Sequence, residues 1–342
     1  MWGLERWPCL CCQSSSAAMR HHSLEESSVA KISWVFPGQG AQFVGMGKEL
    51  YESDAGARAV FQAADRALGY SLSGIIFEGP KEELTLTQNA QPALLTVSMA
   101  CVAVLRRAGL RPDMVAGLSL GEYTALAAAG SLEFEDAVVL THRRGVYMQE
   151  ACPPKEGAMA AILGLSCAEV EALCYEARKF GEVAGANYNC PGQVVISGHK
   201  KAVDEVIRRA AEMGSRAIPL AVSAPFHCAL MRPAAERLQR DLDQSVVRTP
   251  SIPVYSNVHG ERVADPQAIR RSLVDQVTHP VLWQVAVQSM VRDGAGAFVE
   301  IGPGKTLSGF GKRIDATIPF AQFAGPDDLP AVLAFTREAL LR

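Results

Sequence analysis

The sequence predicts an α/β fold, in which a hydrolase-like large domain with a parallel sheet core carries an inserted small ferredoxin-like subdomain. Three observations favour this fold. Short apolar segments typical of buried strands alternate with longer helical segments along most of the chain. Between about residues 154 and 223 the elements become more closely spaced, as in a compact insert. A length of 342 residues with 49% hydrophobic residues supplies enough apolar material for such a core.

The first part of the chain predicts two strands, each followed by helices. Residues 32–36 form an apolar run that ends at Pro37-Gly38-Gln39-Gly40, the pattern of a buried strand followed by a tight glycine turn. Residues 113–116 form a second short strand. Helices are expected at about residues 46–68, 88–105, 120–129 and 134–150.

The second part predicts the insert and then a return to the main pattern. Strands are expected at residues 158–163, 183–187, 193–197 and 216–222, and helices at residues 168–179 and 202–213. This series matches the order of a ferredoxin-like unit. Further strands are expected near residues 254–256 and 297–301. The resulting divisions are a leader (1–29), a large domain (30–153 and 224–320), a small subdomain (154–223) and a C-terminal tail or helix (321–342).

Residues 1–29 differ in composition from the rest of the chain. They are rich in Ser and Cys, show no lasting hydrophobic period, and carry only Glu5 as an acidic residue before Leu24. This composition is typical of an organelle transit peptide. We therefore expect an organelle location, mitochondrial or plastid. The alternative is an extension without an address on a cytoplasmic protein.

Composition and charge argue against several classes of function. The chain has 33 Lys and Arg residues against 36 Asp and Glu residues, a net charge of −3, so a general nucleic-acid binder is not expected. The longest apolar run, at residues 92–105, is too short to span a bilayer. Cys9 and Cys12 have CxxC spacing without a second pair, so the nine cysteines are expected to be reduced thiols rather than zinc ligands.

The clearest chemical signal is the G-x-S-x-G pattern of Gly117, Ser119 and Gly121, which lies between a predicted strand and a predicted helix. A nucleophile elbow requires this context, because the serine must stand on a sharp turn with its hydroxyl exposed. The two glycines remove side chains that would collide across the turn. The N-terminus of the following helix favours negative charge on the attacked carbonyl. The pattern therefore predicts Ser119 as a nucleophile.

A serine nucleophile needs a base, and the chain has seven histidines. Six of them lie in the leader or in contexts that suggest surface or structural roles. His227 differs, because it follows a predicted strand and a proline and directly precedes a new helix, where an imidazole can be held rigidly. We therefore expect His227 to be the base.

A series of further motifs follows the chain from about residue 31 to residue 320. They are Phe36-Pro-Gly-Gln-Gly-Ala-Gln42, Gln91-Pro-Ala, Gly117-Leu-Ser-Leu-Gly-Glu122, Arg144-Gly with Met148-Gln-Glu, Asn189-Cys-Pro-Gly-Gln193, His227-Cys-Ala-Leu-Met231, Ser256-Asn-Val and Glu300-Ile-Gly-Pro-Gly-Lys305. Their order and spacing resemble those of the malonyl-CoA:acyl-carrier-protein transacylases of fatty-acid synthesis and of the related acyltransferase domains of polyketide synthases. The last motif lacks the spacing of a nucleotide-binding P-loop and is expected to form a turn near the floor of the site.

The resemblance assigns a Ser–His dyad. Ser119 is similar to the serine that the family acylates, and His227 is similar to its base. Gln276 occupies the position whose main-chain carbonyl holds the imidazole, in place of an aspartate. Because Ser119 and His227 flank the predicted insert, the site can form only if the outer segments fold together.

The resemblance also assigns the oxyanion hole and the substrate clamp. The backbone N–H groups of Gln39 and Leu120 would bind the oxyanion of the tetrahedral intermediate. Arg144 would bind the malonyl carboxylate bidentately, since an uncompensated anion in a closed site is costly. Arg143 is adjacent, but neighbouring helical residues point about 100° apart, so one arginine at most should face the serine.

The implied activity is a ping-pong transfer of the malonyl group from malonyl-CoA to the phosphopantetheine thiol of acyl carrier protein, through a malonyl-serine intermediate, which supplies fatty-acid synthesis. Malonyl-CoA and phosphopantetheine take part as substrates, and no metal or permanently bound cofactor is implied. We expect a monomer without nucleic-acid or membrane partners. Acyl carrier proteins are acidic, so docking is expected to use a basic rim, for which the candidates are Lys200, Lys201, Arg216 and Lys312.

Two residues depart from the commonest family pattern, and two other functions stay open. Leu118 stands where many members have His, and Phe226 occupies a position linked to acyl selectivity in the polyketide branch. A serine hydrolase would share the elbow but would bring an acidic triad member between Ser119 and His227. A carrier-protein-binding scaffold without activity is the third possibility.

Overall fold

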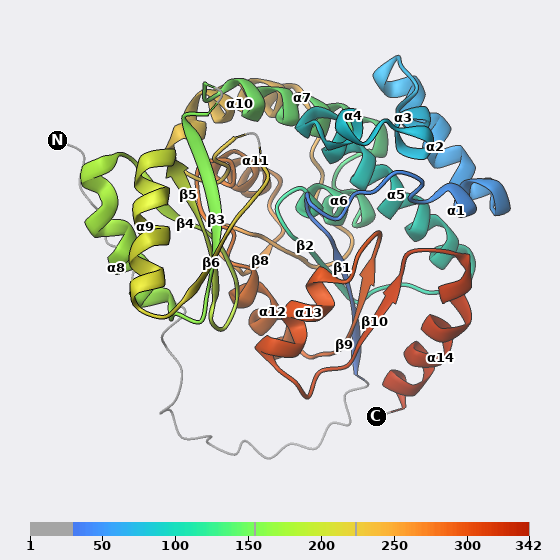
Figure 1. Ribbon diagram of the computed structural model, residues 1–342. Helices are drawn as coiled ribbons and strands as arrows, with labels where there is room; N and C mark the ends of the chain where they lie inside the picture. The colour runs from blue at the N-terminus through green and yellow to red at the C-terminus, as the bar shows by residue number, and fades with distance from the viewer. Residues whose placement is uncertain (1–29, 154, 223, 342) are drawn as a thin grey trace.

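The large domain is built on a six-stranded sheet (Figure 1). The computed structural model describes residues 30–153, 155–222 and 224–341, so the predicted leader, residues 1–29, lies outside the described residues. The strand order is β10 (Phe320–Phe323), β9 (Ala295–Ile301), β1 (Lys31–Phe36), β2 (Met114–Gly117), β7 (Val254–Tyr255) and β8 (Arg262–Val263). Neighbouring strands are parallel except β7 and β8. The predicted α/β fold with a parallel sheet core is confirmed.

Strand β1 lies in the interior of the sheet because it is apolar on both faces. Trp34 and Phe36 join one hydrophobic core with helices α5 (Thr87–Arg107) and α7 (Phe134–Glu150). Val35 joins a second core with α12 (Trp283–Arg292). A parallel strand that is covered by helices on both faces shows a continuous apolar run rather than an alternating pattern. This is why a short run of residues was sufficient to predict it.

The other helices surround this sheet (Figure 1). They are α1 (Lys48–Ser53), α2 (Ala55–Leu68), α3 (Leu72–Glu78), α4 (Lys81–Thr85), α6 (Gly121–Ala128), α10 (Arg232–Gln244), α11 (Pro266–Asp275), α13 (Thr306–Ile314) and α14 (Leu329–Leu340). The segment predicted as one helix at residues 46–68 is divided at Asp54. The Asp54 side chain accepts a hydrogen bond from the backbone N–H of Ala57 (2.8 Å) and so caps α2.

The inserted subdomain has the predicted ferredoxin-like order. Its elements are β3 (Gly157–Leu163), α8 (Cys167–Ala177), β4 (Val183–Cys190), β5 (Gln193–His199), α9 (Lys200–Glu212) and β6 (Arg216–Pro219). The four strands form an antiparallel sheet in the order β4-β5-β3-β6. Helices α8 and α9 contribute with β3, β4 and β5 to a core of its own. The strand predicted at residues 216–222 ends earlier, at Pro219.

Main-chain hydrogen bonds join the insert to the large domain. The N–H of Tyr188 in β4 donates to the carbonyl of Val281 (2.9 Å), and the N–H of Val281 donates to the carbonyl of Ala186 (2.8 Å). The edge strand of the small sheet is therefore paired with a segment that directly precedes α12. This pairing places the insert beside the carboxyl ends of the strands of the large sheet (Figure 1).

The C-terminal segment is part of the large domain rather than a separate tail. The expected helix is present as α14, but the residues before it form β10, which pairs in parallel with β9 at the edge of the large sheet. Helix α14 packs against β1, β9 and β10. The sequence analysis missed β10 because Phe320–Phe323 is short and contains Gln322.

Helix α5 is, within the described part of the chain, the one helix that is long and apolar enough to cross a membrane. It has 21 residues, and 89% of its apolar window is buried inside the fold, as in a core helix. The cysteines of the described residues, from Cys101 to Cys228, are all free and buried. This agrees with the expected reduced thiols, while Cys9, Cys11 and Cys12 lie outside the described residues.

Candidate active site

The predicted nucleophile elbow is present where β2 meets α6. Ser119 has φ 53°, a left-handed conformation that is uncommon for a non-glycine residue and fits the sharp turn of a nucleophile elbow. A Cβ at Gly117 would lie 1.9 Å from the carbonyl oxygen of Gly121, and one at Gly121 would lie 2.3 Å from the carbonyl oxygen of Phe36. Gly117 is therefore required by the closeness of the backbone across the turn, as the sequence predicted, whereas Gly121 is required by the close approach of β1.

Asn257 holds this turn from outside. Its Oδ1 accepts a hydrogen bond from the Ser119 N–H (2.6 Å), and its Nδ2 donates to the Gly117 carbonyl (2.7 Å). Both contacts cross more than 130 positions of sequence. These two hydrogen bonds make Asn257 a positioning residue for the elbow. The sequence analysis noted the motif Ser256-Asn-Val but assigned Asn257 no role.

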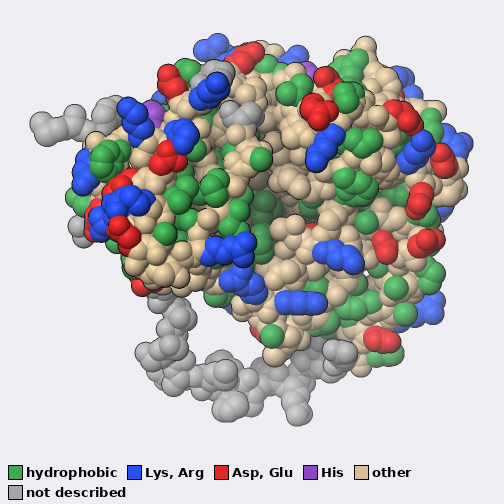
Figure 2. Space-filling model, in the orientation of Figure 1, with side chains coloured by type: hydrophobic (Ala, Val, Ile, Leu, Met, Phe, Trp, Pro, Cys, Tyr) green, Lys and Arg blue, Asp and Glu red, His purple; other side chains and the backbone are tan. Residues whose placement is uncertain are grey.

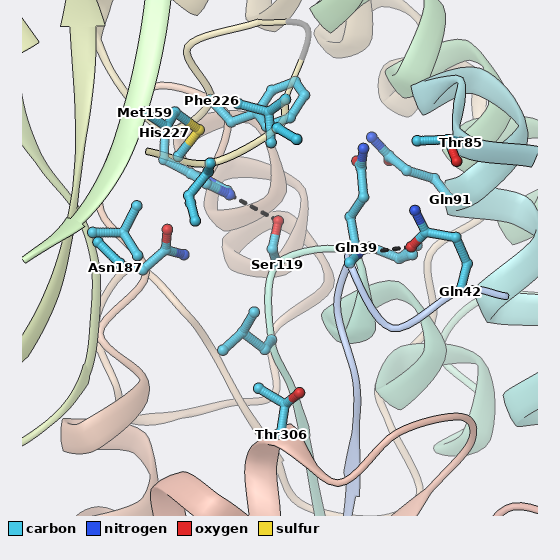
Figure 3. A pocket seen from close by; sticks show the side chains of 18 of the residues that line it. Gln39, Gln42, Thr85, Gln91, Ser119, Met159, Asn187, Phe226, His227 and Thr306 are labelled. Carbon is cyan, nitrogen blue, oxygen red and sulfur yellow. Dashed lines mark hydrogen bonds between the residues drawn. The ribbon is translucent and has the colours of Figure 1, made fainter. Parts of the chain in front are cut away.

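His227 faces the serine as predicted. Its Nε2 lies 2.8 Å from Ser119 Oγ (Figure 3). Its Nδ1 lies 2.7 Å from the main-chain carbonyl oxygen of Gln276. Because a carbonyl can only accept, Nδ1 carries the proton and Nε2 is left to accept a hydrogen bond from the Ser119 hydroxyl. The imidazole is thus oriented by a backbone carbonyl, the contact expected of Gln276. A hydrolase triad would have a carboxylate in this place, so the geometry disfavours the hydrolase.

Arg144 is the second buried group beside the serine. Its side chain reaches from α7, and only 1% of the residue is exposed. Its Nη2 donates to Ser119 Oγ (3.2 Å) and to Gln276 Oε1 (2.8 Å), and its Nη1 donates to Gln91 Oε1 (2.6 Å). Arg143 points elsewhere and binds Asp241 (2.9 Å). One arginine of the pair therefore faces the serine, as predicted.

The predicted oxyanion-hole residues flank the same serine. Gln39 and Leu120 both line the cleft that contains Ser119. Within the described residues, the backbone N–H groups of Gln39 and Leu120 donate no hydrogen bond to the protein. They are therefore free for an incoming oxygen. The nearby N–H of Gly40 is bound instead by Gln42 Oε1 (2.7 Å), which fixes the loop.

These groups open into one cleft of about 700 Å³ between the large domain and the insert. Figure 2 shows it as a hollow near the centre of this face. In Figure 3, Asn187, Met159 and Phe226 lie on one side of Ser119, and Gln39 and Gln42 lie on the other. The volume matches a site for an extended small molecule. Leu118 and Phe226, the two departures from the family pattern, both line it.

Comparison with known proteins agrees with this geometry. Residues 33–314 match the family described as acyl transferase domain.

The chain belongs to the acyl transferase family.

The resemblance drawn from the motifs is thereby confirmed, and individual relatives of this acyl transferase are close. The malonyl CoA-acyl carrier protein transacylase of Bacillus subtilis is 45% identical over 312 residues, covering 91% of this chain and 98% of that protein. The crystal structure of the corresponding enzyme from Clostridium perfringens superposes with a TM-score of 0.88 at 40% identity, covering 90% of this chain and 98% of that one. A malonyl-transacylase in complex with a holo type II polyketide acyl-carrier protein gives a TM-score of 0.87 at 40% identity, covering 89% and 99%.

Burial sets the protonation state of His227 in this acyl transferase. Removal from water, and then the positive charge of Arg144, lower the pKa of His227 to about 3. The imidazole is therefore neutral at pH 7 and ready to accept the proton of Ser119. Among the described residues no group of three His, Cys, Asp or Glu side chains is placed to hold a metal ion.

The lowered pKa of His227 predicts an unusual pH profile for acylation. Protonation disables the base only as the pH approaches about 3, so the rate at which malonyl-CoA acylates the acyl transferase should not fall between pH 7.5 and pH 5. An imidazole with an ordinary pKa of about 6.5 would lose more than 90% of its neutral form over this range. Rapid-quench mass spectrometry of the single-turnover reaction measures the rate. A decline with an apparent pKa between 6 and 7 would contradict the prediction.

Proposed function

We propose that this acyl transferase moves the malonyl group from malonyl-CoA to the phosphopantetheine thiol of acyl carrier protein, and so supplies fatty-acid synthesis. The observation that carries the proposal is the buried guanidinium of Arg144, 3.2 Å from the nucleophile Ser119 Oγ. An ordinary acyl chain offers no partner for this cation, whereas malonate ends in a carboxylate. The names of the relatives support the same substrate pair.

The first half of the reaction forms an ester on Ser119. His227 Nε2 takes the hydroxyl proton while Ser119 Oγ attacks the thioester carbonyl of malonyl-CoA. The N–H groups of Gln39 and Leu120 stabilise the oxyanion of the tetrahedral intermediate. The carbon–sulfur bond then breaks, and the protonated imidazole returns its proton to the departing thiolate of coenzyme A.

The second half of the reaction reverses these steps with another thiol. His227 takes the proton of the phosphopantetheine thiol, whose sulfur attacks the malonyl ester. The carbon–oxygen bond to Ser119 breaks, and the serine oxygen recovers the proton. The imidazole, the N–H groups and the guanidinium supply all the acid–base and charge stabilisation, so we propose that the transfer needs no resident cofactor or metal.

Arg144 has donors available for the malonyl carboxylate. Its Nη2 contact with Ser119 Oγ is released once that oxygen becomes an ester oxygen, and Nη1 uses only one of its two protons, on Gln91. Two N–H groups on adjacent nitrogens match the two oxygens of a carboxylate. The contacts of Arg144 with Gln91 and Gln276 can stay in place and hold the guanidinium in this orientation.

Intact mass spectrometry tests the proposal. We expect incubation with malonyl-CoA to add one malonyl group, which peptide mapping assigns to Ser119, and we expect holo acyl carrier protein to discharge it. Rapid release of free malonate without the carrier would indicate a hydrolase. No adduct would indicate a binding scaffold. Either result would overturn the proposed function.

Exposed basic residues around the cleft suit an acidic carrier protein. Helix α13 supplies Thr306 and Phe310 to the cleft wall and bears Lys312 on its exposed side. Figure 2 shows Lys and Arg side chains below and beside the central hollow. Lys200 and Lys201 instead begin α9 on the outer side of the insert, where Lys200 binds Asp204 (2.6 Å). We therefore propose that the carrier protein docks over α13.

Charge reversal on these two helices separates the candidate surfaces. Lys312→Glu should raise the KM for holo acyl carrier protein by about tenfold, because it places a negative charge against an acidic partner. Malonylation by malonyl-CoA should stay unchanged. Lys200→Glu is the matched control and should leave both steps unchanged. A steady-state titration of the carrier protein measures the effect, and an equal rise in both variants would contradict docking over α13.

We further propose that the chain acts as a monomer, because Ser119, His227, Arg144 and Gln276 all come from one chain. The mass in solution, measured by light scattering, tests this.

The composition of residues 1–29 supports a mitochondrial or plastid location. Fusion of these residues to a fluorescent protein tests the location, and a diffuse cytoplasmic signal would argue against it.

A further inference from the structure

Glu122 is a buried carboxylate that the transfer steps do not use. It lies in the first turn of α6, three residues after Ser119, and is 1% exposed. Its Oε2 accepts hydrogen bonds from Gln276 Nε2 (2.6 Å) and from the backbone N–H of Asn257 (3.1 Å). Within the described residues no donor is bound to Oε1. Both partners therefore donate to the same oxygen.

Gln276 links this carboxylate to the substrate clamp. Its side chain donates from Nε2 to Glu122 and accepts at Oε1 from Arg144 Nη2 (2.8 Å). The amide cannot turn over without setting its NH₂ against the guanidinium, so the charges at its two ends fix its orientation. Glu122 and Arg144 act on each other electrostatically through this short chain. When Glu122 is ionised, the two groups form a neutral pair in the free enzyme.

A bound malonyl group disturbs this balance. Its carboxylate adds a second negative charge beside a single cation, and a net charge in a buried site is costly. An acetyl group adds no charge. Protonation of Glu122 would remove the extra negative charge, and a proton on Oε1 would break neither of the hydrogen bonds to Oε2.

We propose that Glu122 takes up a proton from water when the malonyl group binds Arg144 and gives it back when the malonyl group leaves, so that the buried site holds one negative charge at a time. Glu122 is then a positioning and charge-compensating residue that tunes the preference for malonyl over uncharged acyl groups. This inference rests on the proposed function.

The surroundings of Glu122 support titration near neutral pH. Desolvation by burial raises its pKa to about 7, against the opposing effects of Gln276, Asn257 and Arg144. Arg144 of α7 is the cation that acts on Glu122. The neighbouring residue on α6, Tyr123, has a phenol whose pKa is raised above its ordinary range by burial.

The other ionisable groups near α6 do not titrate with Glu122 at neutral pH. His227 stays neutral, since its pKa is about 3. Arg106 of α5 binds the carbonyl of Ala128, at the opposite end of α6. Strand β2 brings no ionisable side chain, and β1 brings only the exposed Lys31 at its far end.

The first test is the pH dependence of acyl selectivity. We expect the ratio of single-turnover rates for malonyl-CoA and acetyl-CoA to fall by about tenfold from pH 6 to pH 8.5, a middle value for two coupled sites. His227 contributes equally to both rates and cancels from the ratio. In Glu122→Gln the amide oxygen can keep both hydrogen bonds without the charge. Its ratio should stay constant with pH, at the level that the unaltered enzyme has at pH 6.

The second test counts protons and needs no variant. In a weakly buffered solution at pH 7.5 to 8, with an indicator dye, formation of malonyl-Ser119 should consume a fraction of a proton per site that formation of acetyl-Ser119 does not. Release of coenzyme A contributes equally to both reactions. Glu122→Gln should abolish the difference.

A matched control distinguishes Glu122 from any buried carboxylate. Glu300 is also buried, but it binds the N–H groups of Leu307 and Ser308 at the start of α13. Glu300→Gln should keep the pH-dependent ratio. Equal proton uptake with both acyl donors, or a ratio that Glu122→Gln leaves pH-dependent, would overturn the inference. Failure to form any malonyl adduct would instead overturn the proposed function.

Discussion

Replacing Ser119 with Ala should abolish the malonyl adduct and lower transfer to the carrier protein by a factor of about 10⁴ or more. The ping-pong route passes through an ester on Ser119 Oγ, and no other hydroxyl lies against His227 Nε2 in the described residues. The remaining Gln39, Leu120 and Arg144 can bind malonyl-CoA but cannot carry the acyl group. Intact mass spectrometry and a coupled assay for free coenzyme A measure the two effects.

A cysteine at the same position is the informative control. Ser119→Cys keeps a nucleophile next to His227 and should form a malonyl thioester that the carrier protein discharges slowly. Thermal unfolding within a few degrees of the unaltered protein would show that both variants fold. If Ser119→Ala still formed a malonyl adduct that the carrier discharges, Ser119 would not be the nucleophile.

Replacing Arg144 with Ala should lower malonyl transfer by about 10³-fold, equivalent to about 4 kcal/mol of transition-state binding. The malonyl carboxylate would then enter a buried site without its cation, close to the charge of Glu122. Acetyl transfer should change by less than about tenfold, because acetate makes no use of the guanidinium. The ratio of kcat/KM for the two acyl donors measures the change in selectivity.

The neighbouring arginine gives a matched control for this variant. Arg143 lies on the same helix but binds Asp241 on the surface, so Arg143→Ala should alter neither donor by more than about twofold. Equal losses of malonyl and acetyl transfer in Arg144→Ala would contradict the carboxylate clamp. They would mean that the guanidinium only holds Gln91 and Gln276 in place.

Local signals predicted the parts of the site that depend on one turn of the chain. The need for glycine at Gly117 follows from a backbone contact with the nearby Gly121, and the predicted helix that carries Arg144 agrees with α7 at both ends. The need for glycine at Gly121 comes instead from the backbone of Phe36 in β1, a segment distant in sequence. The role of the Gln276 carbonyl came only from the resemblance to the family. A main-chain group has no signature in the sequence, so only the structure shows that the Gln276 carbonyl oxygen lies 2.7 Å from His227 Nδ1.

Contacts between distant segments escaped the sequence analysis. Gln91, Asn257 and Glu122 stood inside recognised motifs, but nothing in their spacing shows that they bind Arg144, the elbow and Gln276, respectively. Polar residues such as Asn also form turns, so their presence in a motif does not by itself indicate a partner in the site. The short edge strand β10 was missed for a related reason, because its pairing with β9 is decided by tertiary packing.

The backbone at the dyad also bears on how such a chain can evolve. Ser119 and His227 both have positive φ, 53° and 60°, a conformation that costs a non-glycine residue about 1 kcal/mol or more. A lineage that kept only the binding surface would gain stability by drifting to glycine at these positions. The presence of both side chains on disfavoured backbone weighs against the chain being an inactive scaffold.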